Sequence, residues 1–376
     1  MKIMFSVGEA SGDVHGASVA AAIKKAAPDA ELFGMGGGKM AESGVRIIYD
    51  IKNLGFIGVA EIIKKIPFFF RLRDTLAEAM KKERPDVLVC IDYPGFNMRL
   101  MKTAKKLGIP VVYYILPTIW AWHKSRGKDI ARYADGVASI FPFEAKAYEE
   151  IGAPVTFVGH PLLDIVKASM SKEETRHTMG IPEGKRAILL MPGSRKQEVQ
   201  SLFPVMLQAA EALQRQYDDL CFVVPRASTI SLKMLTEQLE KAAIPYVITE
   251  GKQYDVMNVC TAAVAASGTA TLETALMELP TVLIYKVAPL TYRLAQILVN
   301  IKMIGLPNIV AGREIIPEFL QDEATPEHVA GALRRLLDDE EYRNTMKLEL
   351  AGVKTALGDP GAVSRVAELI LTIAKE

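Results

Sequence analysis

Short apolar runs recur along the chain, and most are followed by a polar or glycine-bearing turn and then by a helix-forming stretch. An apolar run bounded by turn residues is typical of a strand that is buried on both faces. We expect strands at 3–7, 86–91, 111–115, 136–140 and 155–158 in the first half, and at 187–191, 220–224, 245–248, 262–265 and 281–285 in the second. Strands that alternate with helices predict the α/β class, with doubly wound parallel sheets whose ligands bind at the carboxyl ends of the strands.

The length of the chain, 376 residues, exceeds what one hydrophobic core normally holds. The alternation of strands and helices also restarts after Ser171. We therefore predict a Rossmann-like N-terminal domain at 1–165, a Rossmann-like C-terminal domain at 166–345, and C-terminal helices at 346–376.

The stretch 264–285 reads as a strand, a turn of small residues at Ser267, Gly268 and Thr269, a helix, and a second strand. The first N–H groups of a helix have no partner inside it, so a turn without bulky side chains lets a phosphate approach them. Glu273 stands four residues after Thr269, on the same helical face, and suits the hydroxyls of a ribose. The segment therefore predicts a nucleotide site; the alternative is an ordinary helix capped by Ser267.

A second small-residue turn follows the apolar run 187–191 and consists of Gly193, Ser194 and Arg195. Arginine binds a diphosphate through two N–H groups, and the backbone N–H groups of the turn can add to it. Further along, Asn308 is a polar residue in an apolar loop. We predict that it binds the diphosphate or the base; the alternative is an Asx-turn.

The front half carries acids where the back half carries a cation. The turn after the first strand holds Glu9, Ser11 and Asp13, lacks the G-x-G-x-x-G spacing, and suits sugar hydroxyls better than a phosphate. The alternative is a rigid structural turn. Asp92 ends the strand 86–91, where it could act as general base toward a substrate hydroxyl. Its alternative role is the N-cap of the next helix.

Trp120 and Trp122 follow the strand 111–115, and we predict that they stack on a sugar ring or pack against an acyl chain. The alternative for this pair is ordinary core packing.

An apolar segment with an aromatic end precedes the predicted strand 86–91. Ile62, Ile63 and Ile66 follow helical spacing, and Phe68, Phe69 and Phe70 then stand in a row among lysines and arginines. Three consecutive phenylalanines cannot all face one core, so at least one should be exposed. Exposed apolar residues ringed by cations indicate a surface that dips into an anionic membrane interface. The alternative is a helical hairpin packed in the core.

Composition narrows the class of protein. The formal net charge of +1 does not support a nucleic-acid binder. The three cysteines lie inside strand-like runs without a C-x-x-C pair, which is typical of reduced thiols in a cytosolic protein. The start of the chain lacks the pattern of a signal peptide, and no uncharged stretch reads as a membrane span.

Eight short motifs stand in a fixed order along the chain: G-E-A-S-G-D, I-D-Y-P-G-F-N, P-T-I-W-A-W, P-F-E, F-V-G-H-P, P-G-S-R-K-Q-E, A-S-G-T-A-T-L-E and L-P-N-I-V-A-G-R-E. As an ordered set they closely resemble the lipid-A-disaccharide synthase family. The resemblance implies a glycosyltransferase-B fold, in which two Rossmann-like domains face each other across a cleft and the C-terminal helices return toward the N-terminal domain.

The resemblance also implies the reaction. It joins UDP-2,3-diacylglucosamine to 2,3-diacylglucosamine 1-phosphate, giving a β-1,6-linked disaccharide 1-phosphate and UDP. Asp92 would be the proposed base, Arg195 and Asn308 would be essential, and the family's membrane patch falls on 60–70. The enzyme would be cytoplasmic and attached peripherally to the inner membrane, as a homodimer swapped through its C-terminal helices.

No Asp-x-Asp motif is present, so we expect no metal and no other cofactor, with UDP leaving as the donor's leaving group. Two other readings stay open. One is a different UDP-sugar enzyme of this fold, such as an N-acetylglucosamine epimerase or a muropeptide glycosyltransferase. The other is a nucleotide-sugar-binding membrane protein without catalysis.

Overall fold

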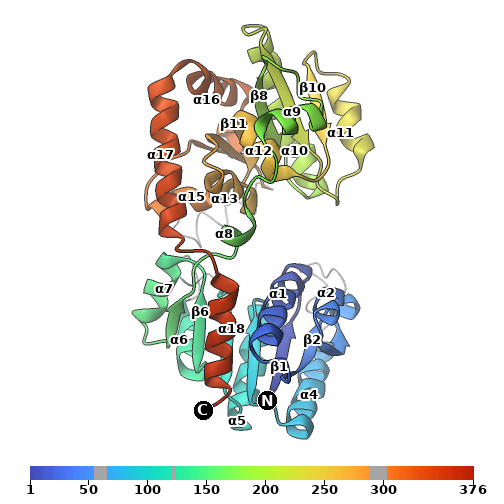
Figure 1. The fold of residues 1–376 in the computed structure, drawn as a ribbon, viewed down its shortest axis with the longest axis vertical. Coiled ribbons are helices and arrows are strands. Elements are labelled where there is room, and N and C mark those ends of the chain that lie inside the picture. The colour runs from blue at the N-terminus through green and yellow to red at the C-terminus, as the bar shows by residue number, and fades with distance from the viewer. Residues whose placement is uncertain (55–65, 118, 120–123, 288–302) are drawn as a thin grey trace. The chain divides into compact units, whose positions relative to one another are not determined.

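The computed structural model describes residues 1–54, 66–117, 119, 124–287 and 303–376 (Figure 1). The chain forms two compact units. The first comprises Met1–Pro161 together with Gly358–Glu376, and the second comprises Leu162–Leu357.

The first unit is built on a parallel sheet with the strand order β3-β2-β1-β4-β5-β6-β7. Its strands are β1 (Lys2–Val7), β2 (Glu31–Gly36), β3 (Arg46–Asp50), β4 (Val87–Ile91), β5 (Val111–Tyr114), β6 (Gly136–Ser139) and β7 (Val155–Phe157). The chain winds outward from β1 in one direction and then returns to add β4 on its other side. The carboxyl ends of β1 and β4 therefore flank the point where the strand order reverses, which is where doubly wound sheets bind ligands.

The second unit repeats this arrangement with the order β10-β9-β8-β11-β12-β13. Its strands are β8 (Arg186–Met191), β9 (Leu220–Pro225), β10 (Tyr246–Thr249), β11 (Cys260–Ala266), β12 (Thr281–Tyr285) and β13 (Glu318–Leu320). Here the strand order reverses between β8 and β11, so the turns that follow these two strands share one edge of the sheet.

Helices connect the strands of both units. The first unit contains α1 (Ala10–Ala26), α2 (Gly38–Glu42), α4 (Ile66–Glu83), α5 (Pro94–Lys106), α6 (Lys124–Tyr133), α7 (Pro142–Glu149), α18 (Ala362–Ile373) and the short helix η1 (Ile51–Leu54). The second contains α8 (Leu162–Ile165), α9 (Lys172–Met179), α10 (Lys196–Gln214), α11 (Leu232–Leu239), α12 (Gln253–Val259), α13 (Thr269–Leu276), α15 (Leu306–Ala311), η2 (Gln321–Glu323), α16 (Pro326–Asp338) and α17 (Glu340–Ala356).

Both faces of each sheet are buried, which explains the unbroken apolar runs of the sequence. Successive residues of a strand point to opposite faces. Met4 and Phe5 of β1 are neighbours, yet both are completely buried, and the same holds for Leu189 and Leu190 of β8. A parallel sheet covered by helices on both faces requires this composition.

The C-terminal helix belongs to the first unit. Helix α18 packs against α1, β4, β5 and β6 (Figure 1). Arg365 Nε donates a hydrogen bond of 2.8 Å to the carbonyl of Val158. A Cβ on Gly136 would lie 2.3 Å from Ile373 Cδ1, so this glycine lets α18 approach β6 closely.

The structural division differs in detail from the boundaries expected from the sequence. The first unit ends at Pro161 instead of residue 165. The expected tail 346–376 is split, because α17 is part of the second unit and only the chain from Gly358 onward belongs to the first. In the parts of the chain that the structure describes, no helix is long and apolar enough to cross a bilayer.

Candidate functional site

Asp92 lies immediately after β4 in a strained backbone conformation. Its φ is +48°, and that of Tyr93 is +51°. Positive φ is uncommon in residues other than glycine, and strain of this kind is retained where the surrounding structure enforces it, often at functional sites. The alternative role of Asp92, as the N-cap of the next helix, is excluded: the N-cap of α5 is Tyr93, and Tyr93 makes no side-chain capping bond.

Hydrogen bonds on both sides hold the Asp92 backbone in place. Its N–H donates to the carbonyl of Tyr114 at 3.0 Å. Its carbonyl accepts from Asn97 Nδ2 at 2.7 Å and from the Tyr113 hydroxyl at 2.9 Å. The carboxylate is half-buried and accepts no hydrogen bond from another side chain of the described residues. The backbone is therefore fixed while the carboxylate stays available.

Asn97 is the residue that sequence reasoning missed here. Its side chain is fully buried. Its Oδ1 accepts from Ser6 Oγ at 2.6 Å, and its Nδ2 also reaches the carbonyls of Ser6 and Ile91. Asn97 thus joins the ends of β1 and β4. The sequence feature that could have identified Asn97 is its place in the motif I-D-Y-P-G-F-N, five residues after Asp92.

Glu9 and Asp92 form a pair of carboxylates at the reversal point of the first sheet. Burial raises the pKa of Asp92, and a hydrogen bond from the Tyr93 backbone partly opposes this. Partial burial raises the pKa of Glu9, and the nearby charge of Asp92 raises it further. Glu9 is the N-cap of α1 but makes no capping hydrogen bond, so its carboxylate is not committed to the helix.

The turn that brings Glu9 to this place needs a glycine. A Cβ on Gly8 would lie 2.1 Å from Tyr93 Cδ1, because the Tyr93 ring packs directly on the backbone there. Ser11 is exposed on the first turn of α1.

The prediction that Asp13 contacts a sugar is wrong. Asp13 is buried, with 6% of its surface exposed. Its carboxylate accepts hydrogen bonds from the backbone N–H groups of Gly37, Lys39 and Met40 at 2.7, 3.0 and 3.2 Å. Asp13 therefore stabilises the start of α2, where the helix N–H groups favour an anion. Trp120 and Trp122, the other two residues predicted for this region, lie outside the described residues.

In the second unit, Glu198 occupies the backbone groups predicted to bind a diphosphate. Its Oε2 accepts from the N–H groups of Ser194 and Arg195 at 3.1 and 3.2 Å. Its Oε1 accepts from Arg195 Nη1 at 2.6 Å. Gly193 has a φ of +110°, and a Cβ there would lie 2.4 Å from Glu198 Oε2. The turn thus binds an anion, but in this structure the anion is a carboxylate of the protein itself.

Arg195 nevertheless remains accessible. Its side chain is 77% exposed, whereas that of Glu198 is only 12% exposed. A guanidinium has five N–H donors, so an arginine held by one carboxylate still has donors for a diphosphate. Glu198 stands three residues after Arg195 in P-G-S-R-K-Q-E, which was the signal that sequence reasoning did not use.

The turn Ser267–Thr269 presents an open helix start. The N-cap of α13 is Gly268, with a φ of +141°, and it makes no side-chain capping bond. The alternative interpretation, an ordinary helix capped by Ser267, is therefore excluded. A Cβ on Gly268 would have no described atom within 4 Å. Thr269 is exposed beside it. The first N–H groups of α13 are thus accessible to an anion such as a phosphate.

Glu273 lies one turn into α13 and is anchored from α12. Its Oε1 accepts from Gln253 Nε2 at 3.1 Å and from the Tyr254 hydroxyl at 2.9 Å. Burial raises the pKa of Glu273, and these two hydrogen bonds oppose that rise. Burial, followed by the charge of Glu273, raises the pKa of Tyr254 to about 12. Gln253 and Tyr254 thus orient one carboxylate oxygen of Glu273.

Asn308 cannot bind a ligand directly, which corrects the prediction. It is fully buried. Its Nδ2 donates to the carbonyl of Ile316 at 2.9 Å and to Glu318 Oε1 at 2.7 Å. Its Oδ1 accepts from the N–H groups of Ile315 and Ile316 at 2.7 and 3.0 Å. Two donors and two acceptor positions are the full capacity of an amide, so Asn308 acts by holding this loop.

The triple phenylalanine of α4 divides between core and surface. Phe68 and Phe69 pack against the core of the first unit, and the Phe69 ring lies 6.4 Å from that of Phe96. Phe70 is 43% exposed. This confirms that one of the three is exposed. Phe68 and Phe69 are half-buried and also contact the core, so their share in a membrane patch stays a prediction. Ile62, Ile63 and the side chain of Ile66 lie outside the described residues.

Cations surround the exposed ring. The guanidinium carbons of Arg73 and Arg99 lie 5.0 and 5.8 Å from the centre of the Phe70 ring. Among the described residues, no group of three or more His, Cys, Asp or Glu side chains could hold a metal ion.

Two Rossmann-like units, each with a polar site where its strand order reverses, define the glycosyltransferase-B class of fold. Solved structures of this class match nearly the whole chain. The UDP-GlcNAc 2-epimerase of Neisseria meningitidis, bound to UDP-GlcNAc, has a TM-score of 0.66 at 13% identity and covers 99% of this chain and 100% of its own. MurG of Acinetobacter baumannii has a TM-score of 0.62 at 16% identity and covers 99% of both chains.

Sequence comparison then specifies the family within this class. The family model described as lipid-A-disaccharide synthetase matches residues 3–365. The lipid-A-disaccharide synthase of Geobacter sulfurreducens is 41% identical over 370 residues, which cover 98% of this chain and 96% of that protein. The synthase of Trichlorobacter lovleyi is 42% identical over 375 residues, covering 100% and 98%. The chain belongs to the lipid-A-disaccharide synthase family.

Proposed function

We propose that this protein is an inverting glycosyltransferase that joins UDP-2,3-diacylglucosamine to 2,3-diacylglucosamine 1-phosphate and releases UDP. The observation that carries the proposal is the family match over residues 3–365. The described geometry agrees with it, because each unit offers one half of the chemistry that a glycosyl transfer requires.

Asp92 is the proposed general base. It removes the proton from the acceptor's 6-hydroxyl as that oxygen attacks the anomeric carbon of the donor. Burial raises the pKa of Asp92, which makes its carboxylate a stronger base than an exposed aspartate. The backbone held by Asn97 and Tyr113 fixes the direction from which the base acts.

The second unit stabilises the diphosphate of the leaving UDP. As the bond to the anomeric carbon breaks, negative charge develops on UDP. The exposed guanidinium of Arg195 and the open N-terminus of α13 offer positive potential to that charge. We propose that these groups take the place of a metal ion, and that Glu273 binds the ribose hydroxyls.

The amphiphilic substrates connect the enzyme with a membrane surface. Phe70 with Arg73 and Arg99 joins an exposed ring to two cations, which suits the interface of an anionic bilayer. We propose peripheral attachment to the cytoplasmic face of the inner membrane. A homodimer swapped through the C-terminal helices stays a prediction, since in this chain α18 packs on its own first unit.

The experiment that tests the proposal is UDP release from a 2,3-diacylated donor in the presence of the 1-phosphorylated acceptor, with mass-spectrometric detection of the disaccharide. Unacylated donor and acceptor serve as controls. We expect UDP release that depends on the acceptor and is matched by disaccharide. UDP binding without turnover would indicate the nucleotide-sugar binder, and conversion of the donor without acceptor would indicate an epimerase.

A further inference from the structure

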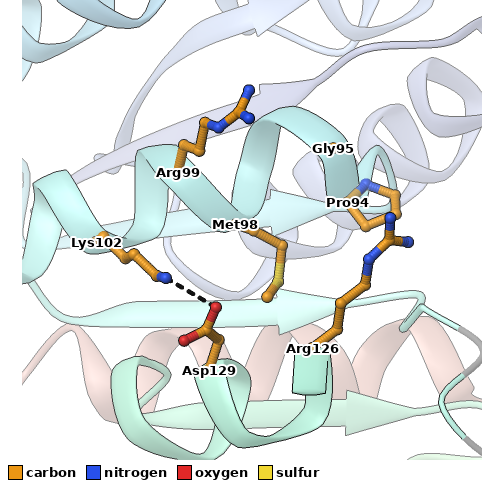
Figure 2. Close-up of a pocket in the computed structure, with 7 residues that line it drawn as sticks. All are labelled: Pro94, Gly95, Met98, Arg99, Lys102, Arg126 and Asp129. Atoms are coloured by element: carbon orange, nitrogen blue, oxygen red, sulfur yellow. Dashed lines mark hydrogen bonds and ion pairs between the residues drawn. The ribbon is translucent and has the colours of Figure 1, made fainter. Parts of the chain in front are cut away.

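A pocket of about 280 Å³ opens on the first unit between the N-terminal part of α5 and α6 (Figure 2). It is lined by Pro94, Gly95, Met98, Arg99, Lys102, Arg126 and Asp129. Figure 2 shows Arg126 extending from α6 toward Pro94, and Met98 pointing into the space between the two helices. At the other end, Lys102 Nζ lies 2.8 Å from Asp129 Oδ2.

The charges of the pocket favour an anion. Three cations line it against one carboxylate, so positive charge remains in excess after Lys102 pairs with Asp129. In Figure 2 Arg99 points away from Met98 and Arg126. The guanidinium carbon of Arg99 lies 5.8 Å from the centre of the Phe70 ring. Arg126 is half-buried and forms no hydrogen bond or ion pair within the described part of the chain. A partly buried guanidinium without a carboxylate has strong donors to offer a phosphate or carboxylate ligand.

The pocket lies close to the proposed base. Pro94, which forms its rim, is the second residue after Asp92, so their Cα atoms are at most about 7.6 Å apart across two trans peptides. One hexose could therefore place a hydroxyl at Asp92 and a charged group in the pocket. The volume of about 280 Å³ is below the usual range for a whole drug-sized ligand, so the pocket suits a charged headgroup and not an acyl chain.

We propose that this pocket binds the phosphate monoester of the acceptor sugar, with Arg126 as its main partner and Lys102 as a second cation. The inference rests on the proposed function and adds a specificity site to it: the enzyme selects an acceptor that carries a phosphate. In the sequence Arg126 stands in a basic run after the tryptophan pair, which could meet a phosphorylated substrate or a lipid headgroup or simply form a solvated helix face. Only folding brings Arg126 to the start of α5.

The test compares two acceptors that differ only in the phosphate. KM and kcat are measured for Arg126→Gln with the short-chain diacylglucosamine 1-phosphate and with the same sugar lacking the phosphate. We expect KM for the phosphorylated acceptor to rise roughly 10- to 100-fold, the scale of a lost hydrogen bond between charged groups. KM for the other acceptor and kcat for both should stay within about twofold of wild type.

Lys128→Gln is the matched control, because Lys128 is exposed on the same helix and does not line the pocket. It should leave both KM values unchanged. Arg126→Lys keeps the charge but loses the planar pair of donors, so its KM should fall between wild type and Arg126→Gln. An equal rise of KM for both acceptors would overturn the proposal, since it would show a general effect on the first unit.

A membrane lipid is the other source of a phosphate, and a separate arm distinguishes it. Binding to vesicles of anionic phospholipid is measured without substrates, for wild type and Arg126→Gln. We expect equal vesicle binding. Weaker vesicle binding together with an unchanged acceptor KM in vesicle-free solution would reject the acceptor site in favour of a lipid headgroup. If wild type does not turn over the phosphorylated acceptor at all, it is the proposed function that fails.

Discussion

The two units have the same strand order around the reversal point but opposite chemistry at it. After β1 and β4 the first unit presents two carboxylates, Glu9 and Asp92, and both have raised pKa values. After β8 and β11 the second unit presents the guanidinium of Arg195 and the open start of α13. The comparison teaches that this topology supplies a place for a ligand, whereas the residues of the turns decide whether the place serves a hydroxyl or a diphosphate.

The largest effect is expected from removing the proposed base of the first unit. Asp92→Asn keeps the shape of the side chain but removes the base, so kcat should fall by about 100-fold or more. UDP affinity, measured by calorimetry, should not change, because the nucleotide site that we propose lies in the second unit. Asp86→Asn, just before the opposite end of β4, is the control and should retain turnover. Full activity of Asp92→Asn would reject the assignment of the base.

The next largest effect is expected from removing the exposed cation of the second unit. Arg195→Ala removes the exposed guanidinium, and UDP affinity should weaken by roughly 10- to 100-fold, as expected for hydrogen bonds to a charged group. Arg215→Ala, at the exposed C-terminal end of the same helix, should bind UDP as wild type does. If Arg195→Ala binds UDP normally, Arg195 serves only to pair with Glu198.

A smaller effect sharpens the role of the strained turn. Asn97→Ala leaves the carbonyl of Asp92 with Tyr113 alone, so the carboxylate should lose its fixed direction and kcat should fall by about tenfold. Stability should also fall by about 1–3 kcal/mol, because buried polar groups lose their partner. Ser6→Ala removes one of the Asn97 contacts and should have a weaker effect on both. Lost stability with an unchanged kcat would make Asn97 structural only.

The smallest effects follow from the raised pKa of Asp92. The proposed base must be ionised, so kcat/KM should decline as the pH falls through a pKa above the ordinary aspartate value. The sign for stability is the opposite. A pKa raised in the folded state favours the protonated form, so ionised Asp92 destabilises the fold as the pH rises through that pKa. Asp92→Asn should therefore have a slightly higher Tm than wild type at pH 7 and no advantage at pH 3. An acid limb at the ordinary carboxyl pKa would contradict this account.

Much of the fold could be predicted from local patterns. The buried strands appear as unbroken apolar runs because both sheet faces are covered, and Asp92, Arg195 and Gly268 stand at strand ends that the alternation already marks. The boundary near residue 345 could not be read in the same way. Consecutive amphipathic helices look alike in sequence, and only packing assigns α17 to the second unit and α18 to the first.

Local patterns and ordered motifs specify the α/β class, the turns that carry the chemistry and the family. Which polar side chains remain available to a ligand follows only from the packing of the folded chain. Asp13 and Asn308 look like ligand-binding residues in the sequence, yet partners on α2 and around Ile316 take up their hydrogen-bonding capacity. Glu198 binds the backbone N–H groups of the turn that was predicted to bind a diphosphate. Arg126 comes from α6 and lines a pocket with residues of α5. The residue type sets the chemistry of a side chain, but its availability to a ligand depends on groups that become neighbours only when the chain folds.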